Sequence, residues 1–253
     1  MGNQMEPAIL RQRLLERLDS EFDLVIVGGG ITGAGIFHEA ASQGYRTLLI
    51  EQKDFSCGTS SRSAKLVHGG LRYLKNGQIR TMLHSISERE KILRCYSRIV
   101  KPIPFLVPVD SFGFRLMLKA GLSIYDLAAG RLSHRYYDQE AFSMLIPSME
   151  RALENGGYSF LDAITDDAQL VLQVIDQGIE QGGTAINYCE YERIVESKGR
   201  IVGIVARDKL SGQDIKIKAP LVINATGIFS DRHHSKVGRA EKLRALRGSH
   251  LIF

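Results

Sequence analysis

The chain has 253 residues, of which 44% are hydrophobic and 24% are charged, and its formal net charge is +5. This composition is typical of one large or two modest globular domains and excludes a disordered or low-complexity chain. The mild excess of cations is compatible with an anionic substrate or an anionic membrane surface. We expect no nucleic-acid partner, because no nucleic-acid-binding motif accompanies the charge.

The three cysteines, Cys57, Cys95 and Cys189, lie far apart, which favours a reducing compartment over a disulfide framework. No run of 18 apolar residues predicts a membrane-spanning helix, and charged residues interrupt the N-terminal stretch where a secretory signal would need an apolar core. We expect no metal site. The adjacent His233 and His234 lack carboxylates or cysteines at ligand spacing, and an exposed turn is the simpler interpretation.

The first 21 residues predict a short helical extension. Leu10, Leu14 and Leu18 recur on one side of a helix over residues 6–19. Such a helix either clamps the following domain or contacts a partner, and packing against the domain is the simpler interpretation.

The most informative motif follows this extension. An apolar strand-like run, residues 23–27, ends in Gly28-x-Gly30-x-x-Gly33, and a helix-compatible run over residues 34–43 comes next. Gly28 permits a tight turn, Gly30 lets the backbone approach phosphates, and Gly33 lets the helix pack close to the strand. The helix start then presents N–H groups to an anion, so the pattern predicts a dinucleotide site.

A carboxylate stands where a ribose-binding acid is expected. A second strand, residues 46–50, ends in Glu51, which lies 23 positions after Gly28, near the usual spacing of about 20. A carboxylate there accepts hydrogen bonds from ribose hydroxyls and disfavours a 2′-phosphate.

The middle of the chain is less regular. Residues 53–70 form a polar loop, and apolar residues recur at helical spacing between residues 77 and 99. We expect the charged residues within that helix to be exposed, namely Glu88, Arg89, Glu90 and Lys91. Three prolines predict an extended and irregular segment over residues 101–108.

An apolar helix-like run occupies residues 112–125, and its only charges are Arg115 and Lys119. Two interpretations remain open here. A basic and apolar helix can lie in a membrane interface with its cations near lipid phosphates, or it can be a buried core helix.

Regular patterns return in the last third of the chain. Asp166 or Asp167 can cap a helix that ends at Gly182-Gly183, and a strand follows over residues 184–188. Residues 191–218 predict an antiparallel meander of three strands. Residues 221–227 predict a buried strand running into a glycine turn, which dinucleotide folds often place beside the first strand.

Two segments resemble one family closely. They are Gly28-Gly-Gly-Ile31-Thr32-Gly33-Ala-Gly-Ile with Glu51, and Thr59-Ser60-Ser61-Arg-Ser-Ala-Lys65-Leu66-Val-His68-Gly-Gly-Leu-Arg72-Tyr73-Leu. Together they resemble the FAD-dependent glycerol-3-phosphate dehydrogenases of aerobic bacteria and mitochondria. Asp166-Asp-Ala-Gln-Leu-Val, Asn224-Ala-Thr-Gly and Arg247-Gly-Ser-His add to this resemblance, which extends from Asp23 to Phe253 in the family's order.

The resemblance implies an α/β fold, with a Rossmann-like FAD-binding domain of the glutathione-reductase-like, DAO type and part of an α+β substrate-capping domain. It assigns residues 22–74 and 166–230 to a discontinuous FAD-binding domain. Residues 75–165 and 231–253 then form a partial substrate-capping and membrane-facing region. Since the family continues well beyond this point, we expect the chain to be the N-terminal portion of a longer protein and to be inactive by itself.

The resemblance also implies which residues contact the cofactor and the substrate. The substrate-side candidates are His68, Arg72 and Tyr73, and the catalytic base is not assigned. The residues expected to bind FAD are Gly28, Gly30, Ile31, Thr32, Gly33, Glu51, Thr59, Ser60, Ser61, Lys65, Leu66, Ala225, Thr226 and Gly227.

The activity implied is the oxidation of sn-glycerol 3-phosphate to dihydroxyacetone phosphate, with hydride transfer to FAD and onward electron transfer to a quinone. The implied location is peripheral, on the cytoplasmic side of a membrane, and a homodimer is compatible with the chain. Two alternatives stay open: a glycerol-3-phosphate oxidase that uses O2, and a non-catalytic FAD-binding fragment.

Overall fold

The computed structural model describes residues 7–71, 73, 77–147, 155–231 and 248–249. The chain divides into two compact units, Met1–Ala64 with Asp167–Phe253, and Lys65–Asp166. Residues 65–74, which we assigned to the cofactor domain, belong to the second unit in this division. Most of residues 231–253, including His233 and His234, lie outside the described residues.

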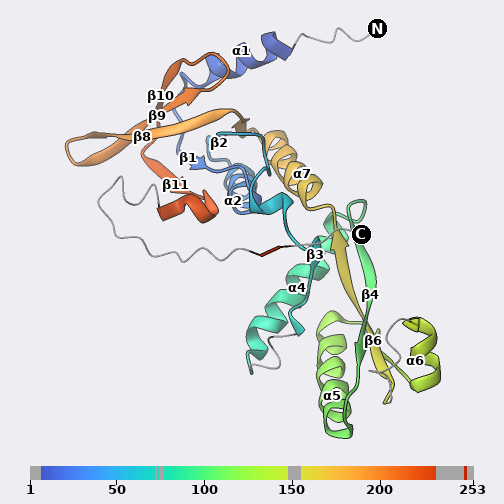
Figure 1. Cartoon of the computed structure of the whole chain (residues 1–253). Coiled ribbons are helices and arrows are strands. Elements are labelled where there is room, and N and C mark those ends of the chain that lie inside the picture. The colour runs from blue at the N-terminus through green and yellow to red at the C-terminus, as the bar shows by residue number, and fades with distance from the viewer. Residues whose placement is uncertain (1–6, 72, 74–76, 148–154, 232–247, 250–253) are drawn as a thin grey trace. The chain divides into compact units, whose positions relative to one another are not determined.

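The first unit is built on a parallel sheet with the strand order β11-β1-β2-β7. Its strands are β1 (Leu24–Val27), β2 (Thr47–Ile50), β7 (Thr184–Ile186) and β11 (Leu221–Asn224). Two helices, α2 (Ile31–Ser42) and α7 (Asp167–Glu180), pack against each other and lie side by side in Figure 1. The expected β-α-β unit and the position of the final strand beside the first are thus confirmed. The expectation that this final strand is buried is wrong, because β11 lies at the edge of the sheet, with Leu221 52% exposed and residues 222–224 half-buried.

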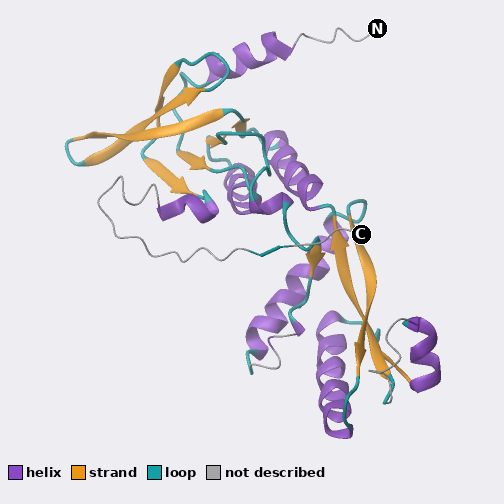
Figure 2. Ribbon diagram, in the orientation of Figure 1, coloured by secondary structure: helices purple, strands orange, loops and turns teal. Residues whose placement is uncertain are grey.

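The meander is also confirmed. The antiparallel strands β8 (Cys189–Ser197), β9 (Arg200–Asp208) and β10 (Asp214–Lys218) form a second sheet, seen as a long ribbon in Figure 2. Its buried side chains share one core with the parallel sheet, in which Val25, Leu48 and Ile204 are fully buried. Apolar burial of this kind is the main driving force that holds the two sheets together.

The N-terminal helix α1 (Pro7–Arg17) packs on its own unit. Leu18, directly after it, is completely buried in the same core, which stabilises the fold by about 2 kcal/mol for a leucine. Arg11 forms an ion pair with Asp208 and donates a hydrogen bond to the carbonyl of Asn187 at 3.0 Å. The extension therefore packs against its own domain, as the simpler interpretation proposed.

The second unit is an antiparallel sheet with helices. Strand β6 (Gly157–Thr165) is central and pairs with β3 (Leu66–Val67), β4 (Val100–Pro108) and β5 (Arg135–Tyr137). The helices are α4 (Ile79–Cys95), α5 (Phe112–Ala129) and α6 (Gln139–Leu145). Helices α4 and α5 contact each other, and their buried side chains form a core with Tyr158 and Phe160 of β6.

Residues 101–108 are extended, as expected, but the expectation that they are irregular is wrong, because they lie within the nine-residue strand β4. Pro102 pairs with Ala163, Pro104 with Leu161 and Pro108 with Gly157, so the three prolines are separated by even numbers of positions along one strand. Alternate residues direct their N–H groups toward the same side, and proline is tolerated where that side forms no ladder hydrogen bonds.

The burial of side chains in α5 supports the core interpretation of residues 112–125 for one face of the helix and leaves the membrane interpretation open for another. Leu118, Leu122 and Tyr125 are buried, while Phe112 is 78% exposed and Leu127 is 82% exposed. One stripe is therefore a core face, and another leaves apolar side chains exposed in this chain. Within the described residues, no helix is both long and apolar enough to cross a bilayer.

Candidate functional site

The glycine loop between β1 and α2 leaves no room for side chains at two of its positions. Gly28 has a φ of +116°, and a Cβ there would lie 2.6 Å from the carbonyl oxygen of Ala225. A Cβ on Gly33 would lie 1.9 Å from the carbonyl oxygen of Gly28. Only glycine tolerates this φ and these approaches, so the predicted roles of both residues in turn and packing have a direct geometric basis.

The start of α2 faces the predicted loop of hydroxyl groups. Gly30 is the N-cap and supplies no side-chain acceptor, while the N–H of Ile31 donates to Oγ of Ser60 at 2.9 Å. A Cβ on Gly30 would lie 3.0 Å from the same Oγ. The structure thus brings Ser60, from the short helix η1 (Thr59–Ser61), to a helix N-terminus, where the helix dipole favours an anion such as a pyrophosphate.

Glu51 lies at the carboxyl end of β2, beside the same loop. One carboxylate oxygen accepts the N–H of Gly29 at 2.8 Å, and the other accepts the N–H of Lys53 at 2.9 Å. These two hydrogen bonds hold the carboxylate at the edge of the glycine loop, where the spacing rule places a ribose-binding acid.

The turn after β11 lies against the first loop. The N–H of Ala225 donates to the carbonyl of Val27 at 2.8 Å. The side-chain oxygen of Asn224 accepts the N–H of Thr226 at 3.2 Å and its hydroxyl at 2.7 Å. Asn224 therefore fixes the Ala225-Thr226-Gly227 turn, a role that we did not assign from the sequence although the Asn-Ala-Thr-Gly motif contained it.

Two further residues organise the loop that follows β2. The N–H and hydroxyl of Ser63 both donate to Asp167 at the start of α7, at 3.2 and 2.8 Å. Ser56, with a φ of +62°, donates its N–H to the carbonyl of Gly29 at 2.9 Å. Its hydroxyl oxygen is buried and has no hydrogen-bond partner among the described residues.

These features fit a flavin adenine dinucleotide. The glycines leave space at the backbone, the helix start attracts phosphate, Glu51 can accept ribose hydroxyls, and the buried Ser56 hydroxyl is available for a further hydrogen bond. All of these groups belong to the first unit.

The remaining predicted residues belong to the second unit. Leu66 pairs with Ile164 of β6, and the carbonyl of Lys65 accepts the N–H of Thr165 at 2.8 Å. His68 is exposed and Tyr73 is half-buried, whereas Arg72 lies outside the described residues.

The two glycines after His68 are required by aromatic rings. A Cβ on Gly69 would lie 2.3 Å from the hydroxyl oxygen of Tyr125, and one on Gly70 would lie 2.4 Å from the Tyr73 ring. The Gly69 N–H donates to Asp162 Oδ1 at 3.0 Å. The backbone next to His68 is therefore held by buried groups, although the His68 side chain itself faces solvent.

A buried arginine completes this support. Arg89 is only 1% exposed, and its guanidinium donates to Asp162 Oδ1 at 3.1 Å, to the Tyr125 hydroxyl, and to Glu90 at 2.7 Å. Burial raises the pKa of Tyr125 far above its ordinary value, so its hydroxyl stays protonated. The expectation that Arg89 is exposed is wrong. The sequence already indicated this burial, because Arg89 lies on the same helix face as the apolar residues Met82 and Ile86.

Two cysteines of the first unit are poor nucleophiles. Burial, with the charge of Glu51, raises the pKa of Cys57, and burial raises the pKa of Cys189 to about 12. Both raised pKa values favour the protonated thiol at neutral pH, which disfavours nucleophilic chemistry at these positions.

Comparison with known proteins places this chain in a family. The model of the family described as FAD dependent oxidoreductase matches residues 23–253. An alpha-glycerophosphate oxidase from Streptococcus pyogenes serotype M1 is 39% identical over 95% of this chain. An aerobic glycerol-3-phosphate dehydrogenase from Bacillus subtilis is 35% identical over the whole chain. This chain spans 41% and 47% of those two proteins, respectively.

Solved structures agree with this placement. The glycerol-3-phosphate dehydrogenase from Bacillus halodurans, complexed with FAD, aligns with 89% of this chain and 38% of its own, with a TM-score of 0.70 and 28% identity. The L-proline dehydrogenase from P. horikoshii, at 18% identity and a TM-score of 0.65, shares the fold. The resemblance to glycerol-3-phosphate dehydrogenases, the Rossmann-like fold and the FAD cofactor are thereby confirmed, and the chain belongs to the FAD dependent oxidoreductase family.

Proposed function

We propose that the protein oxidises sn-glycerol 3-phosphate to dihydroxyacetone phosphate. The observation that carries this proposal is the match of nearly the whole chain to glycerol-3-phosphate dehydrogenases and oxidases, at 35–39% identity. The anchored His68-Gly-Gly loop supports it, because the segment with the most specific resemblance is also one that buried groups hold in place. Since this chain spans less than half of those relatives, the activity is proposed for the whole protein.

The residues of this chain have two tasks in the proposed reaction. Gly28, Gly30 and Gly33 with Glu51 hold the adenosine and pyrophosphate end of FAD, and Thr59–Ser61, Lys65, Leu66 and Ala225–Gly227 line the rest of its path. Bound FAD supplies the two-electron acceptor for the C2 hydrogen of the substrate. His68, Arg72 and Tyr73 are our candidates for contact with the substrate, in which a cation pairs with its phosphate and an imidazole exchanges protons near neutral pH.

Flavin absorbance tests the substrate assignment. The full-length protein, mixed anaerobically with sn-glycerol 3-phosphate, is expected to lose its visible flavin absorbance. Matched controls are the opposite enantiomer, glycerol without phosphate, and L-proline, which reacts in a dehydrogenase of the same fold. Bleaching by one of these control compounds, without bleaching by sn-glycerol 3-phosphate, would contradict the proposal.

For the electron acceptor we propose a quinone, with O2 as the second candidate because alpha-glycerophosphate oxidases are among the relatives. Substrate-dependent oxygen uptake in the absence of quinone separates the two candidates. Little uptake together with rapid quinone reduction is the expected result, and uptake at the quinone rate would establish the oxidase. A flavin that no substrate reduces, with either acceptor, would favour the non-catalytic alternative.

We also propose that the protein binds a membrane surface peripherally, through the exposed apolar stripe of α5. Phe112 and Leu127 are 78% and 82% exposed, and such side chains gain free energy by entering the acyl boundary. Co-sedimentation with vesicles tests this. The variant Met117→Ser/Leu127→Ser removes two exposed apolar side chains from α5, and the control Leu172→Ser/Leu210→Ser removes two exposed apolar side chains from the first unit. Equal sedimentation of wild type and the α5 variant would contradict the proposal.

A further inference from the structure

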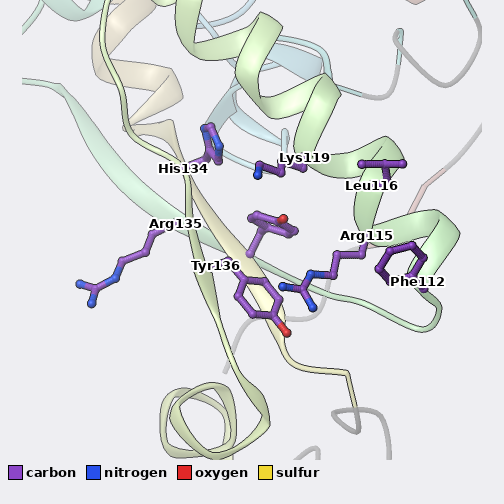
Figure 3. Close-up of a pocket in the computed structure, with 8 residues that line it drawn as sticks. Phe112, Arg115, Leu116, Lys119, His134, Arg135 and Tyr136 are labelled. Atoms are coloured by element: carbon purple, nitrogen blue, oxygen red, sulfur yellow. The ribbon is translucent and has the colours of Figure 1, made fainter.

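One cavity of the second unit is lined by cations and aromatic rings. It has a volume of about 550 Å³ and lies between α5 and the strand β5 with the residue before it, His134 (Figure 3). The described residues that line it include no carboxylate; they are Phe112, Arg115, Leu116, Lys119, His134, Arg135, Tyr136 and Tyr158.

Two cations from α5 reach into this cavity from one helix face. Arg115 and Lys119 are separated by four positions, so their side chains lie above one another, and Figure 3 shows both extending toward the opposite wall. Neither has an ion-pair partner among the described residues, in contrast to Lys91, which pairs with Glu88 at 2.6 Å. Arg135 points away from the other cations in Figure 3, so we do not count it as a ligand.

The position of the Arg115 side chain is fixed by an aromatic ring. The Arg115 guanidinium stacks on the Tyr136 ring at 3.9 Å from its centroid, and Tyr136 in turn lies 5.2 Å from Tyr158. Stacking leaves the N–H groups at the edge of the guanidinium plane free to donate. An Arg held in this way loses less conformational entropy on binding an anion than a freely rotating side chain.

His134 forms the facing wall and is held by a buried carboxylate. Its Nδ1 lies 2.7 Å from Asp126, whose side chain is fully buried and also accepts the N–H groups of Ser133 and His134 at 2.7 and 2.9 Å. Asp126 is therefore saturated by these contacts, and it fixes the imidazole through Nδ1. The opposite ring nitrogen, Nε2, faces no carboxylate in the described residues and can donate to an anion when the ring is protonated.

We propose that this cavity binds a phosphate group carried by an organic molecule with an apolar part. The oxygens of a phosphate point in tetrahedral directions, so they can accept from a guanidinium, an ammonium and a protonated imidazole that come from different elements, whereas the two oxygens of a carboxylate lie in one plane. Phe112 and Leu116, which are 78% and 63% exposed, provide an apolar wall beside the cations. The phosphate can belong to a lipid headgroup or to a soluble ester. The proposal does not rest on the proposed oxidase or dehydrogenase activity.

Direct binding to the whole 253-residue chain tests the site. Inorganic phosphate and phenyl phosphate are titrated calorimetrically, and vesicles of phosphatidylglycerol or phosphatidylcholine are used in co-sedimentation. Phenyl phosphate is expected to bind more tightly than inorganic phosphate, because of the apolar wall. Binding of phenyl phosphate identifies a soluble ester as sufficient, while binding only to phosphatidylglycerol vesicles identifies the lipid headgroup as the source.

The variant Arg115→Gln/Lys119→Gln is expected to weaken binding about tenfold or more, because it removes two charge-assisted hydrogen-bond donors. The matched control Arg94→Gln/Arg98→Gln removes the same charge from exposed positions of the same unit and should bind as wild type does. Thermal melts of both variants verify that the fold is unchanged. Absence of binding by wild type to every probe, unchanged binding by the Arg115/Lys119 variant, or an equal loss in the control would each overturn the proposal.

Discussion

Gly69 and Asp162 are 93 positions apart in the chain, yet the Gly69 N–H donates to the Asp162 carboxylate at 3.0 Å. The same carboxylate oxygen accepts a hydrogen bond from Arg89, and Tyr125 fills the space where a side chain on Gly69 would stand. The loop that carries the substrate-side candidate His68 is therefore tied to the core of the second unit through one buried carboxylate.

Removing that carboxylate should destabilise the second unit. We expect Asp162→Ala to lower the free energy of unfolding by about 3 kcal/mol, because the buried Arg89 loses one of its two carboxylate partners and the Gly69 N–H loses its acceptor. Urea unfolding monitored by circular dichroism measures the change. Asp176→Ala, at an exposed position of α7, is the control and should shift the free energy by less than about 0.5 kcal/mol. Similar stability of both variants would contradict the structural role given to Asp162.

Two glycines of the same helix should behave in opposite ways. A Cβ on Gly33 would lie 1.9 Å from the Gly28 carbonyl oxygen, whereas a Cβ on Gly35 meets nothing within 4 Å. We expect Gly33→Ala to destabilise the chain by about 1–3 kcal/mol and to reduce bound FAD, measured as the ratio of flavin to protein absorbance. Gly35→Ala should instead be neutral or stabilise the helix by up to about 1 kcal/mol. Normal flavin content in Gly33→Ala would contradict the close approach of α2 to the loop.

The Glu51 carboxylate should contribute to cofactor affinity. We expect Glu51→Ala to weaken FAD binding about tenfold, because it removes a charged acceptor for ribose hydroxyls and frees the Gly29 N–H. Glu51→Gln keeps one oxygen and should lose less. Quenching of FAD fluorescence on titration with protein measures the affinity, and Glu180→Ala, at the exposed end of α7, is the control. Wild-type affinity in Glu51→Ala would remove Glu51 from the predicted cofactor site.

Asp126 should make the stability of the second unit depend on acid pH. Burial by itself would raise the pKa of Asp126, but hydrogen bonds from Ser133 and His134 outweigh it and hold the pKa below its ordinary value of 3.8. A carboxyl group with a lowered folded pKa stabilises the fold above pH 3.8 and loses that contribution as the pH falls through the folded pKa.

The variant Asp126→Asn measures this linkage. We expect it to be less stable than wild type by about 1–3 kcal/mol at pH 7, with the difference shrinking below pH 4. Other carboxyls with lowered pKa values, such as Asp208, are present in both proteins, so the difference between the two stability curves isolates Asp126. A difference that stays constant between pH 7 and pH 2.5 would be the contrary outcome.

The sequence by itself determined the elements whose signals are local. Alternation and apolar runs of a few residues predicted β1, β2 and the β8–β10 meander. The spacing of Gly28, Gly30 and Gly33 predicted the turn, because the positive φ of Gly28 and the contact between Gly33 and the Gly28 carbonyl lie within six consecutive residues, although the distant Ala225 carbonyl also approaches Gly28. Resemblance extended this to the cofactor, and the family match confirmed FAD.

Only the tertiary structure decided the features that depend on distant partners. The three prolines are accommodated in β4 because this strand lies at the edge of its sheet and pairs with β6 on one side, so N–H groups that would point to the other side are not needed for pairing. The helix face that Arg89 shares with Met82 and Ile86 indicates an inward position, but the burial of its charge depends on Asp162, 73 positions away, which accepts a hydrogen bond from its guanidinium. No local pattern contains such a partner, since a side chain's environment depends on chain segments that only folding brings into contact.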